Sequence, residues 1–112
     1  MEIKTEVRFG NEHLKKAYNE LNNRTFQEAL LKKWLDRAIG DLEINAFCGT
    51  QIPKKLIPKE YEIKFGTIHN LWKYDLPNGW RMIYTIKKDK VVVLSIILEW
   101  LNHKDYEKRF KY

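Results

Sequence analysis

The residues best suited to chemistry in this 112-residue chain are an arginine, a histidine and a tyrosine in its second half. Arg81 lies in the stretch GWRMIY, and His103 and Tyr106 lie in HKDY. The guanidinium of Arg81 can hold two phosphate oxygens and stays charged at any working pH. The imidazole of His103 titrates near neutral pH and can exchange a proton. On a helix Tyr106 would share a face with His103, where it could hydrogen-bond a phosphate or stack on a base.

These residue types match the requirements of RNA cleavage by the substrate's own 2′-hydroxyl. Such a site must remove that proton, stabilise charge on the phosphate oxygens and protonate the departing 5′-oxygen. Asp105 or Glu99 could orient the His103 ring. A metal site is not expected, because the three histidines lie far apart in sequence, and the single cysteine, Cys48, excludes an intramolecular disulfide. We therefore expect chemistry without a metal or other cofactor.

Each of these residues also has a purely structural interpretation. Arg81 could pair with a carboxylate across a hairpin, and Asp75 is the obvious candidate. His103 could be a surface or capping residue at the start of a helix. The spacing of Tyr106 is equally typical of core packing. Residue types alone leave both interpretations open.

Charge divides the chain into two unlike halves. Residues 1–50 carry 8 Lys/Arg and 8 Asp/Glu, whereas residues 51–112 carry 13 and 7, so the second half holds the whole formal net charge of +6. A clustered excess of cations attracts polyanions such as nucleic acids. Four lysines could hold an RNA backbone, although each could equally be a solvated point charge: Lys54, Lys55, Lys59 and Lys73.

The N-terminal part predicts one strand and two helices. Apolar and polar residues alternate over the first nine positions, which is typical of a half-buried strand. Apolar residues at helical spacing over 14–21 predict a helix that ends near Asn22 and Asn23. Thr25 and Glu28 form a capping box for a second helix. Its apolar stripe, suited to packing on a sheet, comprises Leu30, Leu31, Trp34, Leu35, Ala38, Ile39 and Leu42.

The C-terminal part predicts a β-meander followed by a helix. Residues 48–59 have no periodicity and are expected to form a mobile loop. Residues 61–65 alternate like a strand, yet Pro58 and Gly66 bracket them in a way that favours a short helix. The remaining elements are strands over 71–76, 80–86 and 91–98, turns at 77–79 and 87–90, and a helix through 110 that Asn102 could cap.

Together these elements predict one α+β domain spanning residues 1–112. Its sheet should be small, twisted and mainly antiparallel, with the two N-terminal helices on one face and a short C-terminal helix. Because strand residues alternate, Arg81 shares a face with Ile83 and Thr85. If the larger apolar residues of that strand meet the helices, Arg81 emerges on the opposite, partly open face.

The order of elements, with LPNGWRMIYTI at 76–86 and ILEWLNHKDYEKRF at 97–110, resembles the RelE/ParE toxin superfamily of type II toxin–antitoxin systems, in particular archaeal members and the RNA-cleaving branch. The resemblance implies a RelE-like fold and a ribosome-dependent mRNA endoribonuclease that inhibits translation. It places Arg81, His103 and Tyr106 at the reacting phosphate. The strand Leu94–Trp100 lacks the arginine that RelE itself has at its end, and the C-terminus is closer to members that use histidine.

The resemblance further implies a cognate antitoxin that covers the basic face, and mRNA and the ribosome as partners. A cytoplasmic protein is expected, since no apolar run is long enough to span a bilayer and no signal peptide is evident. The alternatives are a non-enzymatic growth inhibitor of the gyrase-poisoning ParE type and a degenerate toxin acting as an interaction protein. His103 and Tyr106 beside Arg81 would favour the nuclease, since a protein-binding module does not need them together.

Overall fold

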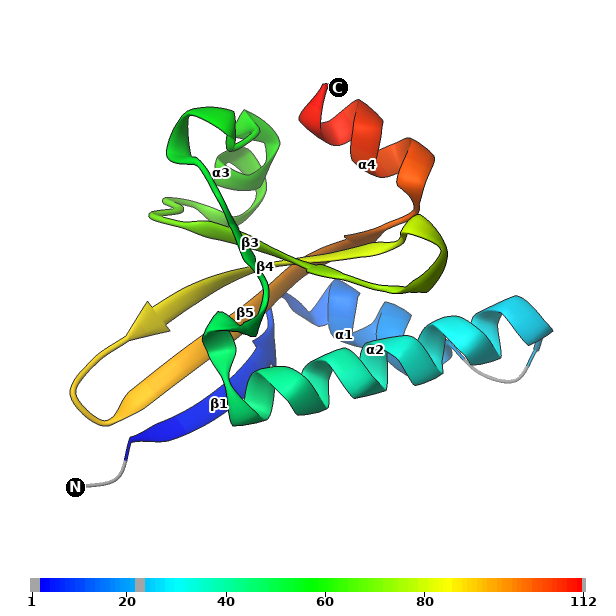
Figure 1. The fold of residues 1–112 in the computed structure, drawn as a ribbon, viewed down its shortest axis with the longest axis horizontal. Coiled ribbons are helices and arrows are strands. Elements are labelled where there is room, and N and C mark those ends of the chain that lie inside the picture. The colour runs from blue at the N-terminus through cyan, green and yellow to red at the C-terminus, as the bar shows by residue number, and fades with distance from the viewer. Residues whose placement is uncertain (1–2, 22–23, 112) are drawn as a thin grey trace.

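A computed structural model describes residues 3–21 and 24–111 and places all strands of these residues in one five-stranded sheet (Figure 1). Its order is β1-β5-β4-β3-β2. Only β1 and β5 run parallel, and every other neighbouring pair is antiparallel. The predicted small, mainly antiparallel sheet is therefore confirmed. The strands are β1 (Lys4–Phe9), β2 (Thr50–Ile52), β3 (Leu71–Asp75), β4 (Arg81–Lys88) and β5 (Val92–Leu101).

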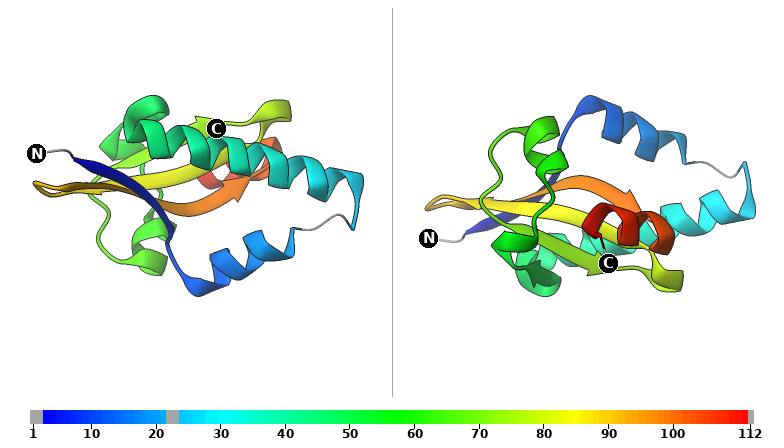
Figure 2. Two further views of the ribbon diagram at one scale, coloured as in Figure 1. Left: turned by 90° about the horizontal axis from the view of Figure 1, so that it is seen from below. Right: turned by 90° about the horizontal axis from the view of Figure 1, so that it is seen from above.

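Helices cover both faces of this sheet. The N-terminal helices α1 (Glu12–Glu20) and α2 (Phe26–Ile44) pack on one face, as predicted. The helices α3 (Lys59–Phe65) and α4 (His103–Phe110) lie on the other, and the two views of Figure 2 separate the pairs clearly. The face that was expected to stay partly open is thus largely covered.

Side-chain caps fix where α1, α2 and α4 begin. The Asn11 side chain accepts a hydrogen bond from the Leu14 N–H, and the Thr25 hydroxyl accepts one from the Glu28 N–H, which is one of the two bonds that the capping box predicts. Asn102 caps α4 in the same way by accepting from the Asp105 N–H at 2.8 Å. The predicted end of the first helix near Asn22 and Asn23 lies outside the described residues.

Alternation along β4 divides its side chains between two cores. Met82, Tyr84 and Ile86 face α2 and join the buried residues of that helix. Ile83 lies on the other face, in a second core that includes Tyr61 of α3 and Tyr106 of α4. Burying each such side chain contributes roughly 1.5–3 kcal/mol, so the α3 and α4 face is held by its own apolar contacts.

A β-bulge in β5 alters the alternation near its end. The register with β4 shifts between Ile83 and Tyr84, which pair with Glu99 and Ile97, so Leu98 is the extra residue. Leu98 belongs to the core beneath α3 and α4, and Glu99 opposite Ile83 faces the same way. The bulge therefore points a carboxylate toward α3 and α4.

The segment 48–59 was wrongly predicted to lack regular structure. It contains β2, which pairs with β3 at the edge of the sheet, and the 3₁₀ turn η2 (Lys54–Leu56). A three-residue strand is too short to reveal a period, which explains the error. Two other 3₁₀ turns are η1 (Ala46–Cys48) and η3 (Pro77–Gly79). None of the helices in the described part of the chain has the length and apolar character needed to cross a membrane.

Candidate functional site

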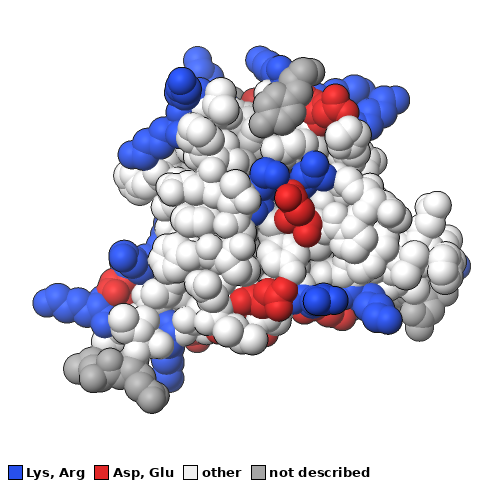
Figure 3. Space-filling model, viewed as in Figure 1, with Lys and Arg blue, Asp and Glu red and all other residues white. Residues whose placement is uncertain are grey.

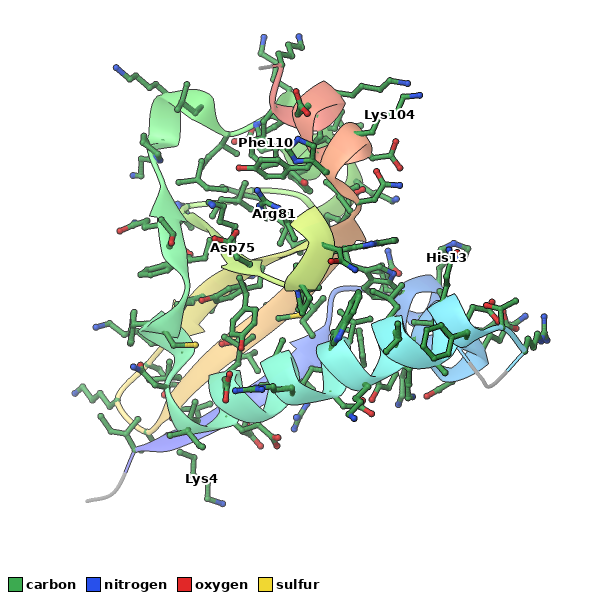
Figure 4. The ribbon with its side chains drawn as sticks, turned by 45° about the vertical axis from the view of Figure 1, so that its right-hand side comes forward. Lys4, His13, Asp75, Arg81, Lys104 and Phe110 are labelled. Atoms are coloured by element: carbon green, nitrogen blue, oxygen red, sulfur yellow. The ribbon has the colours of Figure 1, made fainter. Side chains whose placement is uncertain are left out.

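Arg81 begins β4 beside the turn η3, and three separate contacts hold its guanidinium. Its Nε lies 2.9 Å from Oδ1 of Asp75, the residue opposite it on β3. Its Nη1 donates a hydrogen bond to the Gly79 carbonyl. Its Cζ lies 4.9 Å from the ring centroid of Tyr106, a cation–π contact. The side chain is only 18% exposed, and Figure 4 shows it beside Asp75 on the α4 side of the sheet.

The ion pair of Arg81 with Asp75 confirms the structural interpretation of that arginine. It does not use the whole guanidinium, because among the described residues neither Nη2 nor Nε, which lies within ion-pair distance of Asp75 but without hydrogen-bond geometry, donates a hydrogen bond. The pairing therefore fixes the direction of the side chain and leaves one edge for an additional acceptor. Arg81 can be both an ion-pair partner and a phosphate ligand.

His103, the first residue of α4, meets the same turn. A Cβ placed on Gly79 would lie 2.8 Å from the Cβ of His103, and Gly79 has a φ of +79°, so the turn approaches α4 closely only because this residue is glycine. Since Arg81 donates to the Gly79 carbonyl and the Cβ of His103 lies close to Gly79, both residues border this turn. The structure thus brings the predicted cation and the predicted imidazole to the same turn.

The carboxylate that holds the His103 ring is neither of those expected. Nε2 of His103 lies 2.6 Å from Oε1 of Glu107, one helical turn further along α4. The His103 side chain is 62% exposed, so solvent or a ligand can reach its ring. The backbone N–H of Asp105 instead donates to the Asn102 cap, and the Glu99 carboxylate accepts from Tyr61 and Arg109.

Tyr106 lies in the core, with only 4% of its surface exposed. Its ring packs on Phe110 with centroids 4.7 Å apart and supports the guanidinium of Arg81. The packing interpretation of Tyr106 is thus observed, together with a direct contact to Arg81. Its buried ring is placed to hold Arg81 rather than to stack on a nucleobase.

The four predicted lysines fall into two groups. Lys73 donates to Asp75 at 3.0 Å and so belongs with Arg81. Lys54, Lys55 and Lys59 are exposed on η2 and at the start of α3. A cleft between this segment and the end of α4 is lined by residues that include Lys55, Lys59, Arg109, Phe110 and Lys111.

A charged network that the sequence analysis missed connects α3, α4 and the bulge of β5. Oε2 of Glu99 accepts a hydrogen bond from the Tyr61 hydroxyl at 2.6 Å, and its Oε1 accepts one from Nη2 of Arg109 at 2.9 Å. Nη1 of Arg109 also lies 3.4 Å from Glu60. Burial and the Glu99 carboxylate raise the pKa of Tyr61, so its hydroxyl stays protonated as a donor. The broken alternation at Leu98 and Glu99 was the only sequence signal.

The distribution of charge follows the same division of the fold. Lys and Arg side chains gather over α3 and α4 and again at the hairpin between β4 and β5, whereas along α2 they alternate with Asp and Glu (Figure 3). The basic side is therefore the side that carries Arg81 and His103. Among the residues described, no group of three or more His, Cys, Asp or Glu side chains could hold a metal ion.

The arrangement can bind an anion and exchange a proton beside it. A fixed guanidinium offers charge and hydrogen bonds to phosphate oxygens, and an exposed imidazole at the same turn can give or take a proton. Comparison with known proteins adds nothing to this geometry, because no family model, curated protein or solved structure matches the chain.

Proposed function

We propose that this protein is the toxin of a type II toxin–antitoxin system and cleaves mRNA on the ribosome without a metal ion, in the cytoplasm. The observation that supports the proposal most is the convergence of Arg81 and His103 on Gly79. Arg81 provides a fixed positive charge, and His103 provides an exposed imidazole ring. A domain that only bound another protein would not need this pair at one turn.

In the proposed reaction the 2′-hydroxyl of the substrate attacks the adjacent phosphorus, and the bond from phosphorus to the 5′-oxygen breaks. His103 carries out one of the two proton transfers, either from the 2′-hydroxyl or to the departing 5′-oxygen, and water carries out the other. Arg81 stabilises the charge that develops on the phosphate oxygens. Tyr106 assists by supporting the guanidinium from the core side.

Lysines extend the proposed contact beyond the reacting phosphate. Lys73 lies beside Asp75 and Arg81, and Lys54, Lys55 and Lys59 lie exposed on the segment that leads into α3. Such cations hold a nucleic-acid backbone without reading its sequence. The same basic side would be the surface that an acidic or amphipathic antitoxin segment covers.

Cleavage by single-site variants on translating ribosomes tests the proposal. Purified protein is added to ribosomes that translate a defined message, and the new RNA ends are mapped. Arg81→Ala and His103→Ala should each lower the cleavage rate by about 100-fold or more, because each removes a group acting in the transition state. Arg8→Ala and His13→Ala, at exposed positions on β1 and α1, are matched controls and should cleave like the unmodified protein.

Two outcomes would contradict the nuclease. Intact messages at stoichiometric protein would do so directly. Equal cleavage by folded Arg81→Ala, His103→Ala and unmodified protein would remove the proposed site. Growth arrest that survives both substitutions, without cleavage, would favour the non-enzymatic alternative of the gyrase-poisoning kind.

A further inference from the structure

Two cations of adjacent strands converge on one carboxylate at the candidate site. Nζ of Lys73 lies 3.0 Å from Oδ1 of Asp75, and Nε of Arg81 lies 2.9 Å from the same oxygen. Lys73 is also 3.4 Å from Oδ2. The two cationic side chains are 22% and 18% exposed, whereas the Asp75 side chain is 58% exposed. The carboxylate is therefore the most accessible member of the group.

The position of the arginine does not depend on Asp75 alone. The Gly79 carbonyl accepts from Nη1, and the Tyr106 ring lies against Cζ. These contacts would keep the guanidinium near its place if the carboxylate moved away. A carboxylate and a phosphate present the same kind of charged oxygen acceptors to Lys and Arg. Asp75 thus occupies the position that an incoming phosphate oxygen would take.

A ligand can approach this group from outside. Lys73 and Asp75 border an open cleft of about 480 Å³ at the edge of the sheet, together with Asn45, Gly49 and Thr50. The cleft lies where β2 begins, because its first residue, Thr50, pairs with Lys73 and leaves the stretch of β3 through Asp75 unpaired on that side. An anion in this cleft, which Asp41 also lines, can therefore reach Lys73 and the Asp75 carboxylate without passing through the core, and it meets Arg81 once Asp75 moves away.

We propose that Lys73 and Arg81 form a phosphate-binding site that Asp75 occupies in the free protein, and that a backbone phosphate of RNA binds by displacing the Asp75 carboxylate. The identity of the phosphate as that of RNA rests on the proposed function. The site itself rests on the distances and exposures of the three side chains. Asp75 then lowers the affinity for phosphate and keeps the two cations in place when no ligand is bound.

An isosteric substitution separates this competition from simple charge. Asp75→Asn keeps the shape and removes one negative charge, and Glu62→Gln removes one from an exposed position on α3. Affinity for a short single-stranded RNA is measured for both. Asp75→Asn should bind at least about threefold more tightly than Glu62→Gln, because it frees a local site in addition to raising the net charge. Adding Lys73→Ala to Asp75→Asn should remove the extra gain.

A second arm uses inorganic pyrophosphate as the probe. Its binding is followed by the NMR signal of the Arg81 Nε–H, and Asp75→Asn should bind it more tightly than the unmodified protein does. Asp75→Asn could bind pyrophosphate more tightly while neither the unmodified protein nor any variant binds RNA. That result would support the phosphate site and contradict RNA as the substrate. If neither probe binds Asp75→Asn more tightly than Glu62→Gln, or if the substitution weakens binding, Asp75 only positions Arg81 and the inference is overturned.

Discussion

Arg81 shows how one residue can satisfy two interpretations at once. Its pairing with Asp75 was expected of a structural arginine, and its place beside His103 was expected of a phosphate ligand. The two are compatible because the guanidinium has several donors in a fixed plane. Contacts to Gly79 and Tyr106 restrain the side chain on the protein side, so that a ligand that displaces Asp75 would meet a guanidinium already ordered.

The hydroxyl of Tyr84 on β4 links the sheet to the segment that follows α2. It donates to the Ala46 carbonyl at 2.9 Å and accepts from the Gly49 N–H at 3.2 Å, in the core. Tyr84→Phe would leave both backbone groups without this partner. We expect it to lower the free energy of unfolding by about 1–3 kcal/mol, measured by urea denaturation.

Tyr18→Phe is the matched control for that substitution. The Tyr18 hydroxyl donates to Asp36 at a solvent-exposed position, where water can replace the lost bond. Tyr18→Phe should therefore lower the free energy of unfolding by less than Tyr84→Phe does. Equal losses would show that the Tyr84 hydroxyl adds nothing beyond an exposed tyrosine hydroxyl.

At the scale of elements, the sequence predicted those parts of the fold that depend on local signals. Capping residues and apolar spacing located α2 and α4, and the brackets of proline and glycine located α3 correctly. The alternation in β4 predicted the face of Arg81. These predictions were correct because a helix cap or a strand period is complete within a few neighbouring residues.

The parts that could not be predicted depend on contacts between distant segments. The edge strand β2 is defined by its pairing with β3, and nothing within its three residues indicates a strand. The network of Glu99 with Tyr61 and Arg109 joins three elements. Likewise, the approach of His103 to Gly79, whose carbonyl accepts from Arg81, follows from how α4 leaves β5 and could not be read from any one segment.

The turn between β4 and β5 gives a prediction with a defined dependence on pH. Oδ1 of Asp89 accepts from the N–H groups of Val91 and Val92 at 2.8 and 2.9 Å, and these bonds lower the pKa of Asp89. A carboxyl whose pKa is lower in the folded state stabilises the fold above its unfolded pKa, near 4, and loses that effect as the pH falls through the folded value.

We therefore expect Asp89→Ala to lower the midpoint of thermal unfolding at pH 7. The difference from the unmodified protein should shrink as the pH is lowered below about 4, because Asp89 then becomes increasingly protonated and the unmodified protein loses its ionised acceptor. Thermal unfolding followed by circular dichroism across this range measures it. A difference that stays constant with pH would mean that the charge of Asp89 does not stabilise the turn.

At the scale of the whole molecule, the sheet separates two chemically different sides. The α1 and α2 side comes from the first half of the chain, in which positive and negative charges balance. The α3 and α4 side comes from the second half, which carries the excess of +6, part of it on the hairpin lysines Lys87, Lys88 and Lys90 between β4 and β5. A polyanion should therefore be drawn to one side of the protein in a defined orientation, before any specific contact forms.

This asymmetry predicts how salt affects RNA binding. Each phosphate that a cation neutralises releases counterions, so the logarithm of the affinity for single-stranded RNA falls with the logarithm of salt concentration by about 0.7 per contact. Replacing Lys54, Lys55 and Lys59 together by Ala should make that slope shallower by about two, if all three contact phosphates. Fluorescence titrations of a short RNA from low to moderate salt measure the slope.

The control is a triple substitution that removes three positive charges from the opposite side. It replaces the exposed residues Lys15 and Lys16 of α1 and Lys33 of α2 by Ala. It lowers the net charge equally, so it should weaken binding at low salt through the general field while leaving the slope nearly unchanged. If the two triple variants changed the slope alike, binding would depend on total charge alone. A selective effect of Lys54, Lys55 and Lys59 would instead place the RNA across the α3 and α4 side, next to Arg81 and His103.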